Sequence, residues 1–267
     1  MDIRIHIPLS SHLSGYVTAL WESKFSQSIN ESILPKGIIE IIFNLGDPMD
    51  GLLPGSDIAR RAPLCFIQGL YTKSIFIKFG RRQHLFGIRL QHGMVKKLLG
   101  VLPSELKDNL IDLNLVNPAL DHLWYQLMEA GSFEERVKVI EAEFPILANE
   151  DCRRTEALSR LFNADSIEPF QSVQDLSQQV FYSSRHLNRK TQAMFGMSAE
   201  ELISYKKFMH AIKLLHIDES SLSAIALEAG FYDQAHFCRI FKSLTGITPN
   251  QYRKQKSILP FHIFHQA

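Results

Sequence analysis

Apolar residues in the first half of the chain come in short runs that Gly and Pro separate. The β-branched run 38–44 ends in the turn cluster 45–48, and further runs follow at 64–67, 74–79 and 84–90. The first seven residues alternate between polar and apolar, as a half-buried strand does. Several short strands with tight turns predict a small β-sandwich or β-barrel.

The apolar spacing becomes helical between Pro118 and Phe144. Gly131 divides this stretch, so the pattern predicts a helical hairpin with its turn at that residue. The apolar positions are Leu120, Leu123, Trp124, Leu127, Met128, Phe133, Val137 and Ile140. Such a hairpin either forms a dimer interface or packs as core, and core is the default for any single apolar residue in it. Residues 144–150 are the best candidate for a linker, and 151–162 are predicted to form the first helix of the part that follows.

The last third of the chain repeats itself at an offset of fifty residues. Residues 185–189 (RHLNR) align with 235–239 (AHFCR), and 195–198 (FGMS) align with 245–248 (TGIT). His, Arg and Gly recur at the same places, and apolar residues match apolar ones around them. A period of this size indicates one supersecondary unit that is used twice.

The second copy has the pattern of a helix-turn-helix. Ser221 caps a short helix, and Gly230 follows it where a left-handed residue ends many helices. Asp233 then caps the helix 234–244, whose outer face carries amide and guanidinium groups. The first copy repeats this plan, with Ser183 as the cap of its second helix. The helix 199–216 between the copies is about 27 Å long, so two reading helices could enter major-groove segments one turn of DNA, about 34 Å, apart.

Residues 151–254 resemble the DNA-binding domain of AraC/XylS-type transcription regulators. The runs 230–242 and 246–249, together with Tyr252 and Arg253, match the signature of that family nearly throughout. The segment 34–40 also resembles a variant sensor domain that some of these regulators carry. The resemblance implies a regulator that binds double-stranded DNA without a cofactor. It also implies an N-terminal domain that binds a small effector, forms a homodimer, or both, and RNA polymerase as a further partner.

The resemblance assigns roles to the outward residues of each second helix. Base-reading positions correspond to Arg185, Asn188, Arg189, Gln234, Ala235 and Arg239, and phosphate-binding positions to Ser183, Lys190 and Lys242. A lone Arg or Gln on a helix face is usually only solvated, and one of the arginines could serve an internal ion pair instead. Two departures weaken the first copy: Phe181 stands where the family usually has Gly, and Thr191 where it usually has a core aromatic. A non-Gly residue in the left-handed region costs on the order of 1 kcal/mol.

Composition adds little to this reading. The 267 residues carry a formal net charge of +1, with −2 on the first 150 residues and +3 on the remainder, a weak indication of nucleic acid at the C-terminal end. Cys65, Cys152 and Cys238 are far apart and form no C-x-x-C pair, which favours reduced, buried thiols over a metal site. No apolar run reaches 18 residues and the N-terminus lacks the order of a signal peptide, so we expect a cytosolic chain with no membrane partner.

The N-terminal half carries no enzyme motif. There is no H-x-H pair for a cupin-type metal, no G-x-S-x-G, no Gly-rich phosphate loop and no H-E-x-x-H. Cys65 alone could not build the cysteine-rich methyl-acceptor domain of a DNA-repair relative. We therefore expect no catalysis, and the competing hypothesis is an enzyme or ligand carrier that retains a helical module. Glu40, within an apolar run, is a weak candidate for effector binding if it faces a pocket, although an outward position at a strand edge is favoured.

The predicted fold class is α+β. Residues 1–148 should form a β-rich sandwich or barrel with a helical hairpin, as a sensor or dimerisation domain. Residues 151–257 should form an all-α DNA-binding domain, with helix-turn-helix units at 173–195 and 221–245 and the connector helix at 199–216. The tail 258–264 is apolar enough to dock, but its pattern does not indicate where.

Overall fold

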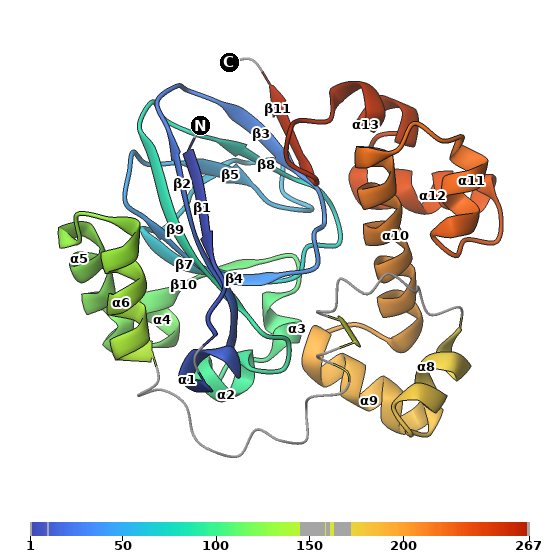
Figure 1. The fold of residues 1–267 in the computed structure, drawn as a ribbon, viewed down its shortest axis with the longest axis horizontal. Coiled ribbons are helices and arrows are strands. Elements are labelled where there is room, and N and C mark those ends of the chain that lie inside the picture. The colour runs from blue at the N-terminus through green and yellow to red at the C-terminus, as the bar shows by residue number, and fades with distance from the viewer. Residues whose placement is uncertain (1, 10, 145–157, 159–160, 163–171, 266–267) are drawn as a thin grey trace.

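The computed structural model describes residues 2–9, 11–144, 158, 161–162 and 172–265. In them, two antiparallel sheets form a sandwich, and a helical part follows it along the chain (Figure 1). Sheet A has the order β1 (Asp2–His6), β2 (Val17–Phe25), β9 (Gln83–Leu90), β4 (Ile39–Asn44), β7 (Cys65–Gln68) and β10 (Leu110–Asp112). Sheet B has the order β11 (His262–His265), β3 (Asn30–Ile33), β8 (Ile75–Lys78), β5 (Asp50–Leu52) and β6 (Arg60–Arg61). The predicted α+β class, with a β-rich N-terminal part and a helical C-terminal part, is confirmed.

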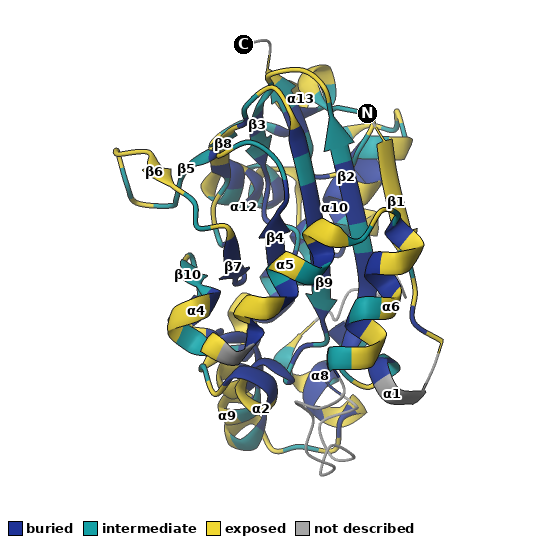
Figure 2. Cartoon of the chain, turned by 90° about the vertical axis from the view of Figure 1, so that its left-hand side faces the viewer, coloured by how far each residue is buried: buried dark blue, intermediate teal, exposed yellow. Residues whose placement is uncertain are grey.

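Strand β4 lies at the centre of sheet A and divides its side chains between two layers. Ile41 and Phe43 belong to the main core, whereas Ile42 packs in a second cluster. Because β9 and β7 pair with β4 along its two edges, every residue of the strand is buried. Figure 2 shows that the central strands of sheet A are buried, whereas its edge strand β1 is exposed. The four apolar runs found in the sequence correspond to strands β4, β7, β8 and β9.

Helices α5 (Asp121–Glu129) and α6 (Phe133–Glu143) form the predicted hairpin beside the sandwich (Figure 1). A capping box begins α6: the Oγ of Ser132 accepts from the N–H of Glu135 at 3.1 Å, and the Glu135 carboxylate accepts from the N–H of Ser132 and of Gly131. Leu123, Leu127, Phe133, Val137 and Ile140 are buried in the main core. The hairpin is thus core of this fold. The short helices α1 (Ser11–Ser14), α2 (Val95–Leu99), α3 (Pro103–Leu106), α4 (Leu113–Val116) and η1 (Pro118–Leu120) complete this part.

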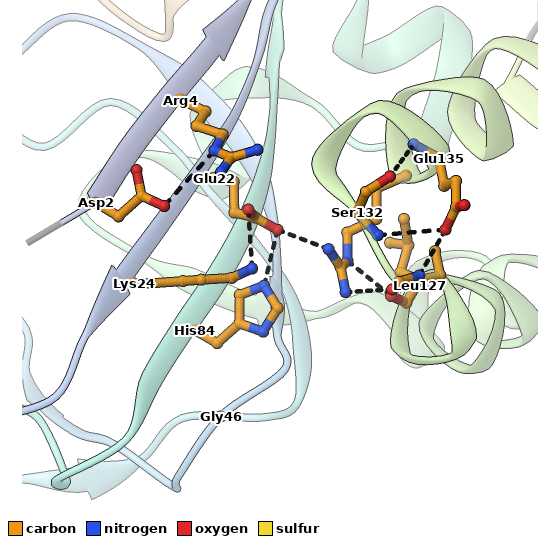
Figure 3. A network of polar contacts seen from close by, with 12 residues as sticks. Asp2, Arg4, Glu22, Lys24, Gly46, His84, Leu127, Ser132 and Glu135 are labelled. Atoms are coloured by element: carbon orange, nitrogen blue, oxygen red, sulfur yellow. Dashed lines mark hydrogen bonds and ion pairs between the residues drawn. The ribbon is translucent and has the colours of Figure 1, made fainter.

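A buried ion network fastens the hairpin to sheet A. Glu22, only 1% exposed in β2, accepts from Arg136 Nη1 of α6 at 2.9 Å and contacts His84 of β9 at 2.8 Å. Lys24 Nζ lies 3.2 Å from the other carboxylate oxygen of Glu22, and Figure 3 shows Lys24 and His84 beside this carboxylate. Arg136 also donates to the carbonyl oxygens of Leu127 and Ala130, which lie at the end of α5.

The helical part contains α8 (Val173–Gln179), α9 (Ser184–Phe195), α10 (Ala199–Ile217), α11 (Leu222–Glu228), α12 (Gln234–Thr245) and α13 (Pro249–Gln255). The predicted linker 144–150 and helix 151–162 lie almost wholly outside the described residues. The division into domains 1–148 and 151–257 stays a prediction. None of the described helices is long and apolar enough to cross a membrane.

The C-terminal tail returns to the N-terminal sandwich. After α13, β11 pairs antiparallel with β3 and becomes the edge of sheet B, with His262 opposite Ile33 and His265 opposite Asn30 (Figure 1). Phe261, just before the strand, accepts from the N–H of Leu34 at 2.8 Å. The apolar tail thus adds a strand to a sheet whose other members lie more than 180 residues earlier in the chain.

Candidate nucleic-acid interface

Side-chain caps position the helices of both helix-turn-helix units. Ser172 and Ser221 cap the first helices, α8 and α11, and Ser183 and Asp233 cap the second helices, α9 and α12. Each cap oxygen accepts from a backbone N–H three residues later, so each helix begins where the sequence predicts. The left-handed residues Gly196 and Gly246 end α9 and α12.

The turns of the two units share one hydrogen-bond pattern. Phe181 donates through its N–H to Gln178 and Tyr182 to Ser177, and forty-nine residues later Gly230 donates to Leu227 and Phe231 to Ala226. Both residues that begin the turns are left-handed, with φ of 55° at Phe181 and 80° at Gly230. Phe181 therefore occupies the position of Gly230, and the strain that the sequence predicts at this residue is present.

The proposed contact residues of α12 lie on the surface. Gln234, Ala235, Arg239 and Lys242 are all exposed. The amide oxygen of Gln234 accepts from Ser223 Oγ at 2.5 Å, which ties the first residue of α12 to α11 and leaves its amide N–H groups available. Beneath this face, Phe237 and Phe241 are fully buried and pack with the connector helix.

The proposed contact residues of α9 are also exposed, except Lys190, which is half-buried. Ser183 is a helix cap, and Asn188 accepts from the N–H of Ala199 at 2.9 Å, so its amide oxygen holds the start of α10. Arg189 contacts the ring of His186 at 3.3 Å. The structural bond of Asn188 was not predicted, because its partner follows it by eleven residues across a turn.

The first unit replaces a buried ring by Thr191, which is fully buried. Its hydroxyl donates to the carbonyl oxygen of Asn188 at 3.1 Å, so the polar group is paired within the helix. Phe195 of the same helix packs against Phe162 and His92, with ring centroids 4.6 and 5.0 Å apart. His92 follows strand β9, so the N-terminal part supports this unit directly.

Helix α10 joins the units and has few exposed residues. Ser198 and Glu201 form a capping box at its start, and nine of its side chains are buried. With 19 residues it is about 28 Å long. Tyr205 of this helix packs in the core that contains the first unit, and Phe208 and Ile212 pack in the core of the second unit. The helix is therefore packed firmly against both units.

His186 and His236 each pack against an aromatic ring of their own unit. The ring of His186 lies 4.4 Å from that of Tyr182, and the ring of His236 lies 5.5 Å from that of Phe231. Cys65 is buried, and burial raises the pKa of its thiol to about 12, while Cys238 is half-buried. Within the described residues, no cluster of His, Cys, Asp and Glu could hold a metal ion.

Glu40 corrects one expectation, since the outward position at a strand edge is wrong. Its side chain is fully buried and accepts four hydrogen bonds, from Trp21 Nε1 at 2.9 Å, Gln68 Nε2 at 2.9 Å, Lys36 Nζ at 3.1 Å and Arg89 Nε at 3.4 Å. Burial raises its pKa, but the charges of Lys36 and Arg89 and the donated bonds outweigh this and hold the pKa below the ordinary value. Glu40 also lines a cavity inside the sandwich.

Two family models match the chain. Residues 176–255 match a helix-turn-helix domain, and residues 5–112 match a domain of unknown function (DUF6597). The helix-turn-helix match runs from within α8 to the end of α13, so it takes in both units described above.

Two HTH-type transcriptional regulators are similar to part of this chain. An uncharacterized HTH-type transcriptional regulator of Haemophilus influenzae is 34% identical over 86 residues, which cover 32% of this chain and 29% of the relative. A similarly described protein of Staphylococcus aureus is 34% identical over 82 residues, covering 31% of this chain and 11% of the relative. The matches thus span less than a third of either relative.

Two solved structures are similar to parts or most of this chain, both with TM-scores below 0.5. A crystal structure of ToxT from Vibrio cholerae is 14% identical, covers 87% of this chain and 95% of its own, and has a TM-score of 0.45. The C-terminal domain of the response regulator yesN from Fusobacterium nucleatum is 32% identical, covers 31% of this chain and 80% of its own, and has a TM-score of 0.29.

Proposed function

We propose that this chain is a transcription regulator that binds a specific site in double-stranded DNA through α9 and α12. The observation that carries the proposal is the pair of capped helices with exposed polar faces, one in each unit, held by the single helix α10. With a spacer of about 28 Å, each helix meets its own segment of the major groove on one side of the duplex.

The exposed side chains fall into two sets by their chemistry: one set suits contacts to bases, and the other suits contacts to phosphates. Arg185, Arg189 and Arg239 can each donate two parallel hydrogen bonds to guanine, and the free amide N–H groups of Gln234 and Asn188 reach base acceptors. Ala235 offers only apolar contact, which suits a thymine methyl. Ser183, Lys190 and Lys242 contact phosphates and set the register without specifying sequence.

Selection of bound oligonucleotides from a random pool tests the proposal. A single recovered motif with two half-sites about one helical turn apart is the expected result. Affinity for that motif, measured by fluorescence anisotropy against salt concentration, should fall steeply with salt and exceed the affinity for random duplex. Recovery of no motif, with equal affinity for all duplexes, would overturn the proposal.

Two exposed residues of α12 give a matched pair of variants. Arg239→Ala should lose about 1–3 kcal/mol of discrimination at one base pair, because a base-specific contact disappears. Lys242→Ala should weaken all sequences alike and lower the salt slope by about one. Equal losses on all sequences for Arg239→Ala would contradict its role as a base reader.

The N-terminal part is proposed to sense a small molecule, to form a homodimer, or both. In support, the tail strand β11 and the connector helix both contact the sandwich, so a change there reaches the DNA-binding part. RNA polymerase is a proposed partner at the promoter. We infer no catalytic step, since the charged groups at the cavity bind one another around Glu40 and are placed to hold a structure.

A further inference from the structure

The cavity beside Glu40 lies between the two sheets. It has a volume of about 220 Å³, and its walls come from strands of both sheets and from the C-terminal tail. Ile3 and Ile5 of the edge strand β1 line it and are 36% and 61% exposed, so the cavity reaches the surface there. An apolar cavity of about 150 Å³ already accommodates benzene. This one therefore has room for one aromatic ring or two fused rings.

A row of polar side chains crosses the wall that sheet A gives to this cavity. In the strand register, Glu40 of β4 lies opposite both Arg89 of β9 and Gln68 of β7, so these three side chains leave the sheet on one face. Ile42, two residues further along β4, shares that face and lines the cavity, whereas Ile41 between them packs in the main core on the other face. The polar row therefore faces the cavity.

The carboxylate of Glu40 has no acceptor capacity left. Its Oε1 accepts from Trp21 at 2.9 Å and from Arg89 Nε at 3.4 Å. Its Oε2 accepts from Gln68 at 2.9 Å and from Lys36 at 3.1 Å. A carboxylate accepts about four hydrogen bonds, and the two terminal nitrogens of Arg89 donate none within the residues that the structure describes. The forked end of this guanidinium therefore remains available to a further acceptor.

The charges at this end of the cavity do not cancel. Lys36 and Arg89 are two cations against the single carboxylate of Glu40, which leaves one positive charge in excess. The other acidic group on the wall, Glu31, contacts His262 of the tail at 2.5 Å. The side chains of Lys36 and Arg89 are 18% and 36% exposed, so both are partly withdrawn from water and still within reach of a ligand. An anion is attracted more strongly at such a site than in open solvent.

The rest of the wall is mostly apolar and rich in aromatic rings. The ring of Trp21 occupies the space that a side chain at Gly87 would need. Phe66 and Phe79 come from one buried cluster, and Ile33 comes from another. Such a wall gains from apolar contact and offers no partner to a polar group. A ligand that fills the cavity must therefore have an apolar body, with its polar group at the row of Glu40.

We propose that the cavity binds a compact apolar molecule with one carboxylate, and that this carboxylate pairs with the terminal nitrogens of Arg89 and with Lys36. A carboxylate fits the fork of a guanidinium and matches the excess of one charge, whereas a phosphate monoester brings nearly two charges. The inference rests on the sensing role in the proposed function and names the chemical class of the effector.

The segment that carries Lys36 is held by the helical part of the chain. Leu34 packs in the core of the second helix-turn-helix unit, and its N–H donates to the carbonyl oxygen of Phe261 at 2.8 Å. The N–H of Gly37 donates to the hydroxyl of Tyr205 in α10 at 3.1 Å. A ligand that binds Lys36 therefore acts on a backbone that contacts both the tail and the connector helix. Occupancy of the cavity thus bears on the second helix-turn-helix unit.

An acid and an amide of the same shape test the ligand class on the full chain. In titration calorimetry, 2-naphthoate should bind at one site about tenfold or more tighter than 2-naphthamide, because only the acid forms charge-assisted bonds with the two cations. An amide that binds as tightly as the acid, or no binding of 2-naphthoate at about 1 mM, would overturn the proposal. Tighter binding of 2-naphthyl phosphate than of 2-naphthoate would contradict the match to a single charge.

Arg89→Gln tests the assigned partner. The variant removes the fork and its charge but leaves three donors on Glu40, so the fold should persist. The affinity for 2-naphthoate should fall to about that for 2-naphthamide, while the affinity for the amide stays the same. Arg82→Gln is the matched control, since Arg82 pairs with Asp47 outside the cavity wall and the net charge changes equally. An unchanged preference for the acid in Arg89→Gln, or an equal loss in both variants, would refute the assignment.

Hydrogen exchange of the full chain tests the route to the helical part. Saturating 2-naphthoate should slow the exchange of the amides of Leu34 and Gly37 and of those in β11, as well as in the central strands. Protection confined to sheet A would show that binding does not reach the tail or the connector helix. These measurements contain no DNA, so their failure leaves the regulator proposal standing, and a failed oligonucleotide selection leaves the cavity result standing.

Discussion

The hydroxyl of Tyr205 donates to the backbone carbonyl oxygen of Tyr71 at 2.7 Å, which ties the connector helix to the wall of the cavity. The same hydroxyl accepts from the N–H of Gly37 at 3.1 Å. Gly37 is left-handed, with φ of 69°, and a Cβ at this residue would clash with the side chain of Met209 in α10. The helix thus packs directly on this backbone, which only glycine permits here.

Replacing Tyr205 by Phe should destabilise the protein. The variant leaves the Gly37 N–H and the Tyr71 carbonyl unpaired in a site that is closed to water, and each unpaired group costs about 1–3 kcal/mol. We therefore expect the free energy of unfolding, measured in urea, to fall by about 2 kcal/mol or more. Tyr125→Phe is the exposed control and should change it by less than about 0.5 kcal/mol. Equal effects of the two variants would show that the Tyr205 contacts contribute nothing.

A second variant tests the buried network in Figure 3. Arg136→Met keeps much of the side-chain volume but leaves Glu22 without its guanidinium and the end of α5 without two donors. Breaking a buried pair in this way typically costs about 3–5 kcal/mol. Arg4→Ala removes the surface pair of Arg4 with Glu134, whose side chains are about half or more exposed, and should cost less than about 1 kcal/mol. Denaturation in urea compares the two, and a similar loss in both would contradict the network's structural role.

Local chemistry explains why the helical part was predictable. Asp233 and Gly230 act within a few residues of the positions they cap or turn, so their effect is visible in the sequence. Gly131 likewise marks the turn of the hairpin α5–α6 within its own stretch of sequence, and the strain at Phe181 is visible from that residue and its place in the turn. The exposure of the predicted contact residues on α12 follows from helical spacing alone, while their roles on DNA stay a prediction.

Distant partners explain what was missed. Glu40 was expected at a strand edge, but its burial depends on β7 and β9, which follow β4 by more than twenty residues and take positions on its two sides. The pairing of the tail with β3 joins residues about 230 apart, and no local pattern encodes it. The cavity and the free hydroxyl of Tyr71 likewise arise only when both sheets are assembled.

The stability of the fold should depend on pH through His92. Burial lowers its pKa to about 3, and the charge of Lys206 acts in the same direction, while a bond with the backbone of Gly37 opposes them. The folded state therefore keeps His92 neutral, whereas the unfolded chain protonates it below its ordinary pKa of about 6.5. As the pH falls below that value the unfolded state binds the extra proton, so stability decreases by up to about 1.4 kcal/mol per pH unit until the pKa near 3 is reached.

His92→Phe isolates this contribution, because a phenyl ring can keep the packing against Phe162 and Phe195. Urea denaturation of both proteins between about pH 7 and pH 5 avoids most carboxylate titration. The pH slope of the variant should be shallower by about 1 kcal/mol per unit. Other histidines with lowered pKa values, His84, His210 and His216, titrate in both proteins and cancel in the difference. Parallel curves would show that His92 takes up its proton as readily in the folded state as in the unfolded chain.

The turn of the first helix-turn-helix unit offers a stabilising substitution. Phe181 has φ of 55°, and its ring is 93% exposed, so the residue is strained and contributes little burial. Phe181→Gly removes strain of about 1 kcal/mol, although the greater freedom of glycine in the unfolded chain offsets part of it. Tyr232 is similarly exposed but has no positive φ, so Tyr232→Gly relieves no strain and only increases the freedom of the unfolded chain. It should lower the free energy of unfolding by about 0.5–1 kcal/mol. The two variants should therefore change the free energy of unfolding in opposite directions, and a loss in both would mean that the first turn stores no strain.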